Sequence, residues 1–334
     1  MSDKPCSHWE VFVVDDQSSD NTVKIAEQTI GIVAGADQPS AAVLQAGPRP
    51  KGERWVGKNW GCSQAMEQIR SEWVLFIDAD VTLAPDAIRR ALQQSINEKA
   101  DLFSLAPRLT CGCLAEWMVQ PIMASLLGLG FPILEANDPA STVAFAAGPF
   151  MLFRRNSYNT IGGHRALAGE VVEDLALARR IKEGGFRLRY VLGIDAVNLQ
   201  MYANLEALWE GWSKNWFLGL DRSISKSLGA GGVVLLMFTL PWLLLPTSLT
   251  MAFLSNQDQI LWLCDAGFAF IAILMQLGVR LWTRTRFSVP LRHWWLMGIG
   301  GVIIGLIAPT SVWKSLTGRG WTWKGRSLAE AHEL

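Results

Sequence analysis

The pair Asp78 and Asp80 follows directly after the apolar run 73–77. Two carboxylates separated by one residue can share a hard divalent cation, which prefers oxygen ligands and completes its coordination with substrate phosphates. Without a cation, bringing the two charges together would cost electrostatic repulsion. The sequence therefore predicts a metal-bound diphosphate near Asp78 and Asp80.

A second group of polar residues follows the apolar run 11–14. Asp15, Asp16 and Ser18 can present acceptors to a nucleotide base or ribose at the end of a strand. The alternative is structural, because residues 19–20 also suit the N-cap of a following helix.

Glu173 and Asp174 open a helix-like stretch that ends before a Gly-Gly pair. A carboxylate in the first turn of a helix is stabilised by the helix dipole, which predicts a lowered pKa and an ionised general base. Electrostatic capping of the same helix explains the two residues equally well, so both interpretations stay open.

Two Trp-containing stretches give weaker signals. Lys58 lies between two aromatic residues and beside a glycine, which suits a phosphate and a sugar face, although a solvated lysine is the ordinary interpretation. Trp212 and Trp216, with Lys214 between them, fall on one side of a predicted helix. That stripe predicts a substrate wall, a membrane-facing surface or, most commonly, core packing.

The first 220 residues alternate short apolar runs with helix-like stretches. The runs 11–14 and 73–77 predict buried strands, and 85–97 and 173–183 predict helices. This alternation predicts an α/β domain with a mostly parallel central sheet, in which ligands bind beyond the carboxyl ends of the strands.

Composition changes after residue 226, since residues 227–257 contain no Asp, Glu, Lys or Arg. This length exceeds the ~20 apolar residues that span a bilayer, and we predict transmembrane segments at about 228–254, 260–282 and 294–313. Several glycines and Pro309 predict that the third segment is broken or re-entrant rather than a full span. The basic loop around 284–292 places this loop and the preceding domain in the cytoplasm.

The stretch 117–134 is also long, with 18 residues and no charge. Its two prolines and two glycines argue against a regular span, so it predicts an amphipathic segment in the membrane interface. A buried core helix is nearly as good an interpretation. These boundaries predict a domain at 1–226, a membrane block at 227–313 and a basic, Trp-containing tail at 314–334.

Overall composition limits the function classes. Lys plus Arg and Asp plus Glu number 30 each, so no net charge attracts nucleic acid. Five cysteines without a Cys-x-x-Cys pair indicate neither a disulfide framework nor a zinc site. The N-terminal residues contain no apolar stretch of the kind found in signal peptides.

In order and spacing, the motifs at 14–20, 57–58, 78–80 and 173–174 resemble those of family 2 glycosyltransferases with the GT-A fold. The membrane-anchored branch that includes ceramide, hopanoid-associated and carotenoid glycosyltransferases is the most similar, and 321–326 resembles a tail that such members often show. The resemblance implies a role for each motif. Asp15 and Asp16 would contact the nucleotide of a UDP-sugar, and Lys58 would contact its diphosphate. Asp78 and Asp80 would bind Mg2+ or Mn2+, and Asp174 would act as the base.

The resemblance further implies an inverting transfer to a lipid hydroxyl at the cytoplasmic membrane face. Two departures from the family pattern qualify it. Only about ten residues precede the first predicted strand, so the usual N-terminal strand is predicted to be missing. The Gln/Arg-x-x-Arg-Trp motif is replaced by residues 211–216, which puts the roles of Lys214 and Trp216 in question. A non-catalytic nucleotide-sugar-binding module or a polysaccharide synthase are the alternatives.

Overall fold

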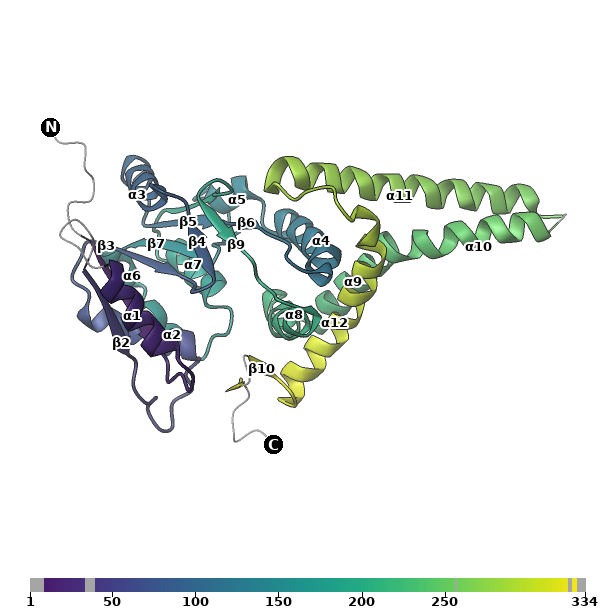
Figure 1. Ribbon diagram of the computed structural model, residues 1–334. Helices are drawn as coiled ribbons and strands as arrows, with labels where there is room; N and C mark the ends of the chain where they lie inside the picture. The colour runs from purple at the N-terminus through teal and green to yellow at the C-terminus, as the bar shows by residue number, and fades with distance from the viewer. Residues whose placement is uncertain (1–8, 34–39, 256, 324–325, 329–334) are drawn as a thin grey trace. The chain divides into compact units, whose positions relative to one another are not determined.

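The computed structural model describes residues 9–33, 40–255, 257–323 and 326–328 of the 334-residue chain. Figure 1 shows the order of its elements. The chain divides into two compact units. Unit 1 comprises Met1–Ala79, Leu83–Pro107 and Ile133–Val197, and unit 2 comprises Asp80–Thr82, Arg108–Pro132 and Asn198–Leu334. Cys6 and Lys324, which contribute to the cysteine count and the basic tail, lie outside the described residues.

Unit 1 begins with a parallel pair of strands. β1 (Glu10–Asp15) and β2 (Ser40–Gln45) are connected through helix α1 (Thr22–Val33). The two strands pair in parallel from Glu10 opposite Ser40 to Asp15 opposite Gln45. The predicted strand at 11–14 is therefore present, and its last residue is the predicted ligand Asp15.

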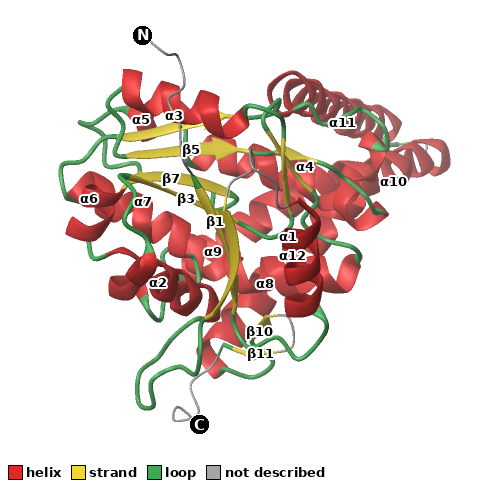
Figure 2. Ribbon diagram, turned by 60° about the vertical axis from the view of Figure 1, so that its left-hand side comes forward, coloured by secondary structure: helices red, strands yellow, loops and turns green. Residues whose placement is uncertain are grey.

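The main sheet of unit 1 has four strands in the order β3-β7-β5-β8. These are β3 (Trp73–Ile77), β7 (Phe150–Arg154), β5 (Leu102–Ala106) and β8 (Leu188–Leu192). β7 runs antiparallel to both of its neighbours, and only β5 and β8 are parallel. Figure 2 shows β3, β7 and β5 lying next to one another. The sheet is mixed, so the prediction of a mostly parallel sheet is not confirmed; a buried apolar run specifies a strand but not its direction.

Helices flank these strands. They are α2 (Gly57–Gln68), α3 (Ala87–Asn97), α5 (Ile133–Asn137), α6 (Arg155–Thr160), the 3-10 helix η1 (Gly163–Leu167) and α7 (Glu173–Glu183). The predicted helix at 173–183 has the bounds of α7. The helix predicted at 85–97 begins two residues later, because Asp86 adopts a left-handed backbone with φ 64° and cannot belong to it. The core of the unit includes Leu102, Phe153, Leu177 and Ile181, all fully buried.

Unit 2 is built around helices. A small sheet has the order β4-β9-β6, with β4 at Val81–Leu83, β9 at Val197–Leu199 and β6 at Arg108–Leu109. All of its residues except Leu83 and Val197 belong to unit 2. Helices α4 (Leu114–Gly130) and α8 (Leu205–Gly219) follow β6 and β9 along the chain. The hairpin of β10 (Thr322–Trp323) and β11 (Arg326–Ser327) lies in the tail.

Three helical segments of unit 2 are long and apolar enough to span a membrane: Ile224–Leu254, Gln259–Phe287 and Trp294–Thr317. The first consists of α9 (Ile224–Val234), a π-helical turn η2 (Leu235–Thr239) and α10 (Leu240–Leu254). The second is α11 (Gln259–Phe287), which packs along α10. The third contains the 3-10 turn η3 (Trp294–Leu296) and α12 (Met297–Thr317). By their length and composition, these segments indicate membrane association.

α12 is one continuous helix, so the third segment is not broken there, and whether it re-enters or spans the membrane stays a prediction. Its glycines are positions of close packing instead. A Cβ atom on Gly300 would overlap the carbonyl oxygen of Met118 on α4, and a Cβ atom on Gly298 would lie 2.8 Å from the Trp242 ring. Glycine in a membrane helix lets neighbouring backbones approach closely, and Pro309 is accommodated inside the helix.

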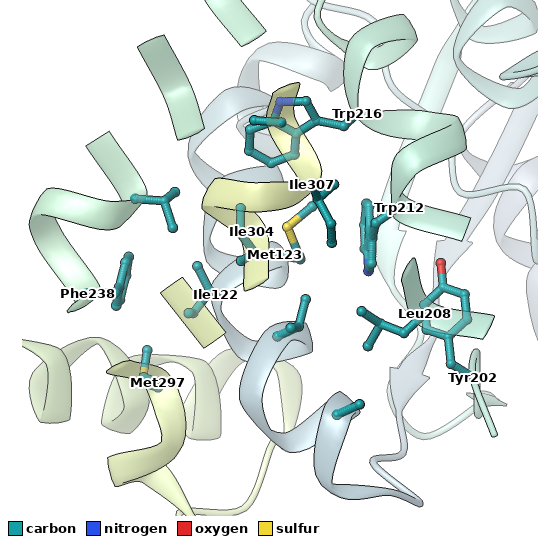
Figure 3. Close-up of a cluster of buried hydrophobic side chains, with 14 residues drawn as sticks. Ile122, Met123, Tyr202, Leu208, Trp212, Trp216, Phe238, Met297, Ile304 and Ile307 are labelled. Atoms are coloured by element: carbon teal, nitrogen blue, oxygen red, sulfur yellow. The ribbon is translucent and has the colours of Figure 1, made fainter. Parts of the chain in front are cut away.

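The stretch 117–134 contains most of α4. The middle of α4 is buried in the core of unit 2, where Ile122 and Met123 contact residues of α8 and α12 (Figure 3). This burial agrees with the alternative interpretation of a core helix. Leu129 and Leu134, near the end of the stretch, are 74% and 86% exposed, so an interfacial position for that end stays a prediction.

Candidate active site

Lys58 joins two of the acidic motifs. It is the second residue of α2, and its Nζ lies 2.5 Å from Oδ1 of Asp78 and 2.6 Å from Oε1 of Glu173. Burial disfavours its charge, but the attraction of Glu173 and Asp78 is stronger and raises the pKa of Lys58 well above its ordinary value. A charged lysine thus holds together the end of β3 and the start of α7.

The residues after β1 lie near the same helix. Asp15 is only 5% exposed, and both of its carboxylate oxygens lie 3.3 Å from the backbone nitrogen of Ser18, which donates to them. Asp16 forms an ion pair with Arg49, at 2.6 Å from its Nη2. Ser18 is exposed. Asp15 therefore fixes the turn after β1, while Asp16 is held by a cation from the loop after β2.

Gly57, the residue before Lys58 in the first turn of α2, lies against the ion pair of Asp16 and Arg49. A Cβ atom at Gly57 would overlap Oδ2 of Asp16 and would lie 2.8 Å from Nη2 of Arg49. Only glycine lets the carboxylate of Asp16 approach the first turn of α2 this closely. An anion is favourable at that position, because the helix dipole leaves partial positive charge at the N-terminus. Residues from all four sequence motifs therefore come together within unit 1: 14–20, 57–58, 78–80 and 173–174. Of the motif 78–80, Asp78 belongs to this unit.

Asp174 has a perturbed acidity. Burial, and after it the charge of Glu173, raise the pKa of Asp174 to about 6, against the lowering effects of Lys58 and of backbone hydrogen bonds. The backbone nitrogen of Gly148 donates to its Oδ2 at 3.0 Å and that of Leu175 donates to its Oδ1 at 2.7 Å. The pKa lowering predicted from the helix dipole is thus wrong in direction, because burial and a like charge outweigh it.

Such a carboxyl group suits proton transfer. With a pKa of about 6 it is mostly ionised at neutral pH and binds a proton more strongly than an ordinary aspartate. Gly148 also fixes its place, since a Cβ atom there would lie 3.0 Å from Oδ2 of Asp174. Asp174 can therefore act as a general base.

Three residues of the site were not predicted from the sequence: Arg49, Gly148 and Asn59. The amide of Asn59 is fully buried and donates to the carbonyl oxygens of Leu167 at 2.5 Å and Glu170 at 2.8 Å. It thereby ties α2 to the loop before Glu173. Its position next to Lys58 is the only signal that could have drawn attention to it.

The two carboxylates predicted to hold a metal stand at the end of β3. Asp78 pairs with Lys58, and Asp80 follows in the turn before β4. Among the described residues there is no group of three or more His, Cys, Asp or Glu side chains that could hold a metal ion. A magnesium-like cation binds through one or two carboxylates and substrate phosphates, and a metal site at Asp78 and Asp80 stays a prediction.

The Trp-rich helix α8 belongs to unit 2. Trp212 and Trp216 are 8% and 6% exposed and lie in the hydrophobic core shown in Figure 3. Their indole nitrogens donate to Oε1 of Gln120 at 3.1 Å and to the carbonyl oxygen of Ser227 at 3.2 Å. The two rings therefore serve packing. A role in acceptor binding for them and for Lys214 on the same helix stays a prediction.

Comparisons with known proteins point to one family. The family model described as Glycosyl transferase family 2 matches residues 2–162. The 4,4'-diaponeurosporenoate glycosyltransferase of Staphylococcus aureus (strain USA300) is 25% identical over 232 residues, which are 69% of this chain and 58% of that protein. The same protein from strain Newman matches equally. The chain thus spans a little over half the length of these curated relatives.

Two solved structures share a general likeness of fold. A crystal structure of S. aureus TarS 1–349 in complex with UDP-GlcNAc is 15% identical, with a TM-score of 0.40 over 92% of this chain and 84% of that chain. Glucosyl-3-phosphoglycerate synthase from Mycobacterium tuberculosis, crystallised with Mn2+, UDP-glucose and phosphoglyceric acid, is 16% identical, with a TM-score of 0.34 over 60% and 63% of the chains. At these scores the likeness says nothing about ligands.

Proposed function

The chain belongs to glycosyltransferase family 2 through residues 2–162, and from this premise we propose that it transfers a sugar from a nucleoside-diphosphate sugar, with UDP as the nucleotide, to a lipid hydroxyl. The transfer inverts the configuration of the anomeric carbon and takes place at the cytoplasmic face of a membrane. The ion pairs of Lys58 are the observation that supports the proposal most. They join Asp78 and Glu173, which are 95 residues apart in the sequence, at the first turn of α2.

The reaction requires one proton transfer in which Asp174 takes part. An oxygen of the acceptor hydroxyl attacks the anomeric carbon, and its proton passes to the carboxylate of Asp174. The new bond forms as the bond between the anomeric carbon and the β-phosphate oxygen breaks, and that electron pair leaves with the nucleoside diphosphate. Burial and the charge of Glu173 raise the pKa of Asp174 to about 6. This carboxylate is therefore a stronger base than an exposed aspartate.

The remaining site residues bind and orient the donor. Asp15 and Asp16, with Ser18 in the same turn, offer acceptors to the base and ribose. Lys58 contributes positive charge for the diphosphate. Asp78 and Asp80 would hold Mg2+ or Mn2+, which offsets the negative charge that grows on the leaving diphosphate.

The membrane part of the chain agrees with a lipid acceptor. Three helical segments are long and apolar enough to span a bilayer, whereas a nucleotide sugar is soluble in water. A single protein that joins an α/β domain to such helices can take one substrate from each phase. The named activity of the S. aureus relative, on 4,4'-diaponeurosporenoate, also supports an apolar acceptor.

The test is a transfer assay with the full chain purified in detergent. We would incubate it with a panel of nucleotide sugars, Mg2+ or Mn2+, and a bacterial lipid extract, and detect nucleoside diphosphate release and new glycolipid by mass spectrometry. Asp174→Asn should lose transfer while keeping nucleotide affinity. The matched control Glu27→Gln removes an exposed carboxylate on α1 and should leave both unchanged.

Each contrary outcome has a clear meaning. Full turnover by Asp174→Asn would refute the role of Asp174. Metal-dependent nucleotide binding without any transfer would refute the enzymatic proposal and favour a binding module. Products with many added sugars would favour a polysaccharide synthase.

A further inference from the structure

Arg280 is a buried cation in the second membrane segment. It lies in α11 and is fully buried, with an exposed fraction of 0%. Its Nη2 donates to the carbonyl oxygen of Arg292 at 3.0 Å. Its Nε and Nη1, which carry three N–H donors, have no hydrogen-bond partner. A guanidinium group in this state is costly, because a buried charge requires pairing.

The side chains around Arg280 do not balance its charge. It stands over the ring of Trp117, at 5.7 Å from the ring centroid, which gives a cation–π contact but no counter-ion. Cys111 interacts with it electrostatically, but burial and the nearby Glu116 raise the pKa of Cys111 to about 12, so this thiol is neutral at pH 7.

Glu116 is the carboxylate of α4, and both of its oxygens accept hydrogen bonds from other groups. One accepts from the backbone nitrogen of Gly112 at 2.8 Å and the other from that of Tyr202 at 2.9 Å. Among the residues that the structure describes, no carboxylate lies within ion-pair distance of Arg280. The missing negative charge therefore has to come from outside the described part of the chain.

Arg280 lies near one end of the second membrane segment. It is seven residues before the end of α11 at Phe287, which corresponds to about 10 Å along a helix. Arg284 and Arg286, in the last turn, are exposed. The exposed positive charges of α11 thus begin one turn after Arg280, and basic residues at the end of a membrane helix attract anionic lipid headgroups.

We propose that Arg280 binds the oxyanion of a membrane lipid, a phosphate or a carboxylate, between α11, the start of α4 and the loop that follows α11. The ligand accepts hydrogen bonds from Nε and Nη1 and supplies the missing charge. Its apolar chains lie along the exposed apolar surface of α11, which includes Phe268 and Met275. This site is independent of the sugar-transfer chemistry in unit 1.

The loop after α11 provides a way in. Ser288 and His293 have left-handed backbones with φ 55° and 59°, which are unfavourable for residues other than glycine. Between them, the carbonyl oxygen of Arg292 accepts the one hydrogen bond of the guanidinium group. A shift of this loop can exchange that carbonyl for a stronger, charged acceptor.

The proposal is tested by lipid binding to the full chain in detergent, read by native mass spectrometry and by the thermal unfolding midpoint. The probes are phosphatidylglycerol, phosphatidylcholine, oleate, methyl oleate and inorganic phosphate. We expect the wild type to bind phosphatidylglycerol or oleate at least tenfold more tightly than the uncharged or zwitterionic probe of the same chain length. Inorganic phosphate should give no shift, because it has no apolar chain.

Variants then assign the binding to Arg280. Arg280→Gln should lose the preference for the anionic lipid, and Arg280→Lys should keep part of it, since it retains the charge without the planar guanidinium group. The matched control Arg70→Gln removes an exposed arginine charge of unit 1, outside the basic end of α11, and should keep the preference.

The probes distinguish the possible sources of the oxyanion. Binding of phosphatidylglycerol alone identifies a headgroup phosphate, and binding of oleate alone identifies a lipid carboxylate. A wild type that does not discriminate between charged and uncharged lipid would overturn the proposal, whatever the variants do. An equal preference in Arg280→Gln, or an equal response to inorganic phosphate, would overturn it as well.

Discussion

Asp174→Asn should make the protein more stable at neutral pH while removing transfer. The reason is that the native state keeps a carboxylate charged in a partly buried place beside Glu173. Burial, and after it the charge of Glu173, raise the pKa of Asp174 from 3.8 to about 6. In the unfolded chain the group has an ordinary pKa, so ionising it costs more in the folded state.

The size of the effect follows from that shift. One pKa unit corresponds to 1.36 kcal/mol, so the ionised Asp174 lowers the free energy of unfolding by about 3 kcal/mol. Asparagine avoids this cost but can accept only one of the two hydrogen bonds from Gly148 and Leu175, and losing the other costs about 1 kcal/mol. The expected net gain is about 2 kcal/mol.

The gain should depend on pH with a definite sign. A carboxyl whose pKa is raised by folding contributes most to stability below the unfolded pKa, where it is protonated in both states. This contribution is lost as the pH rises through about 6. The variant has no such group, so its advantage over the wild type should be large at pH 8 and should vanish near pH 4.

Urea unfolding of the purified chain in mild detergent measures this difference, with the pH varied from 4 to 8. Glu27→Gln, which removes an exposed carboxylate, controls for the change in net charge. A variant that is less stable than the wild type at pH 8, or a difference that does not change with pH, would refute the reasoning that Asp174 is held ionised at a cost.

Three further predictions rest on single positions. The logarithm of the transfer rate should fall by one for each pH unit below pH 6, because Asp174 becomes protonated. A fall that begins only near pH 4 would contradict the raised pKa of Asp174. Gly57→Ala should weaken nucleotide binding about tenfold in a titration, because overpacking costs ~1–3 kcal/mol against Asp16, whereas Gly31→Ala, which has open space, should bind as the wild type does. Gly300→Ala should lower the unfolding midpoint through its clash with the α4 backbone, and unchanged stability would show that this packing is not tight; Gly229→Ala, which meets nothing within 4 Å, is the control.

Some elements could be predicted because their ends are marked locally. The strand 73–77 has the predicted bounds because its apolar run ends just before Asp78. The helix 173–183 has the predicted bounds because Gly185, shortly after its end, adopts a left-handed backbone. The direction of β7 could not be predicted in this way. All of its first four residues are buried, so its pattern is the same for a parallel and an antiparallel neighbour.

The candidate site was predicted as separate motifs and not as a connected arrangement. Asp16, Lys58 and Asp78 were recognised by type and by their place after a strand or near a helix start. Their partners were not, because ion pairs such as that of Arg49 with Asp16 join segments whose approach depends on the whole fold. The glycines of α12 were predicted to break the helix for a related reason. Glycine is used both where a helix breaks and where two helices pack closely, and the sequence alone does not distinguish these two uses.

The acidity of Asp174 shows which interactions a local argument omits. Its place in the first turn of α7 is visible in the sequence, and the helix dipole at that place stabilises a negative charge by about 0.3–1 kcal/mol. That is less than one pKa unit. Burial can shift a carboxyl pKa by several units, and here it acts together with the charge of Glu173. Because the larger contributions come from tertiary structure, the sign of the shift reverses, and the group becomes a stronger base than its position in the helix predicts.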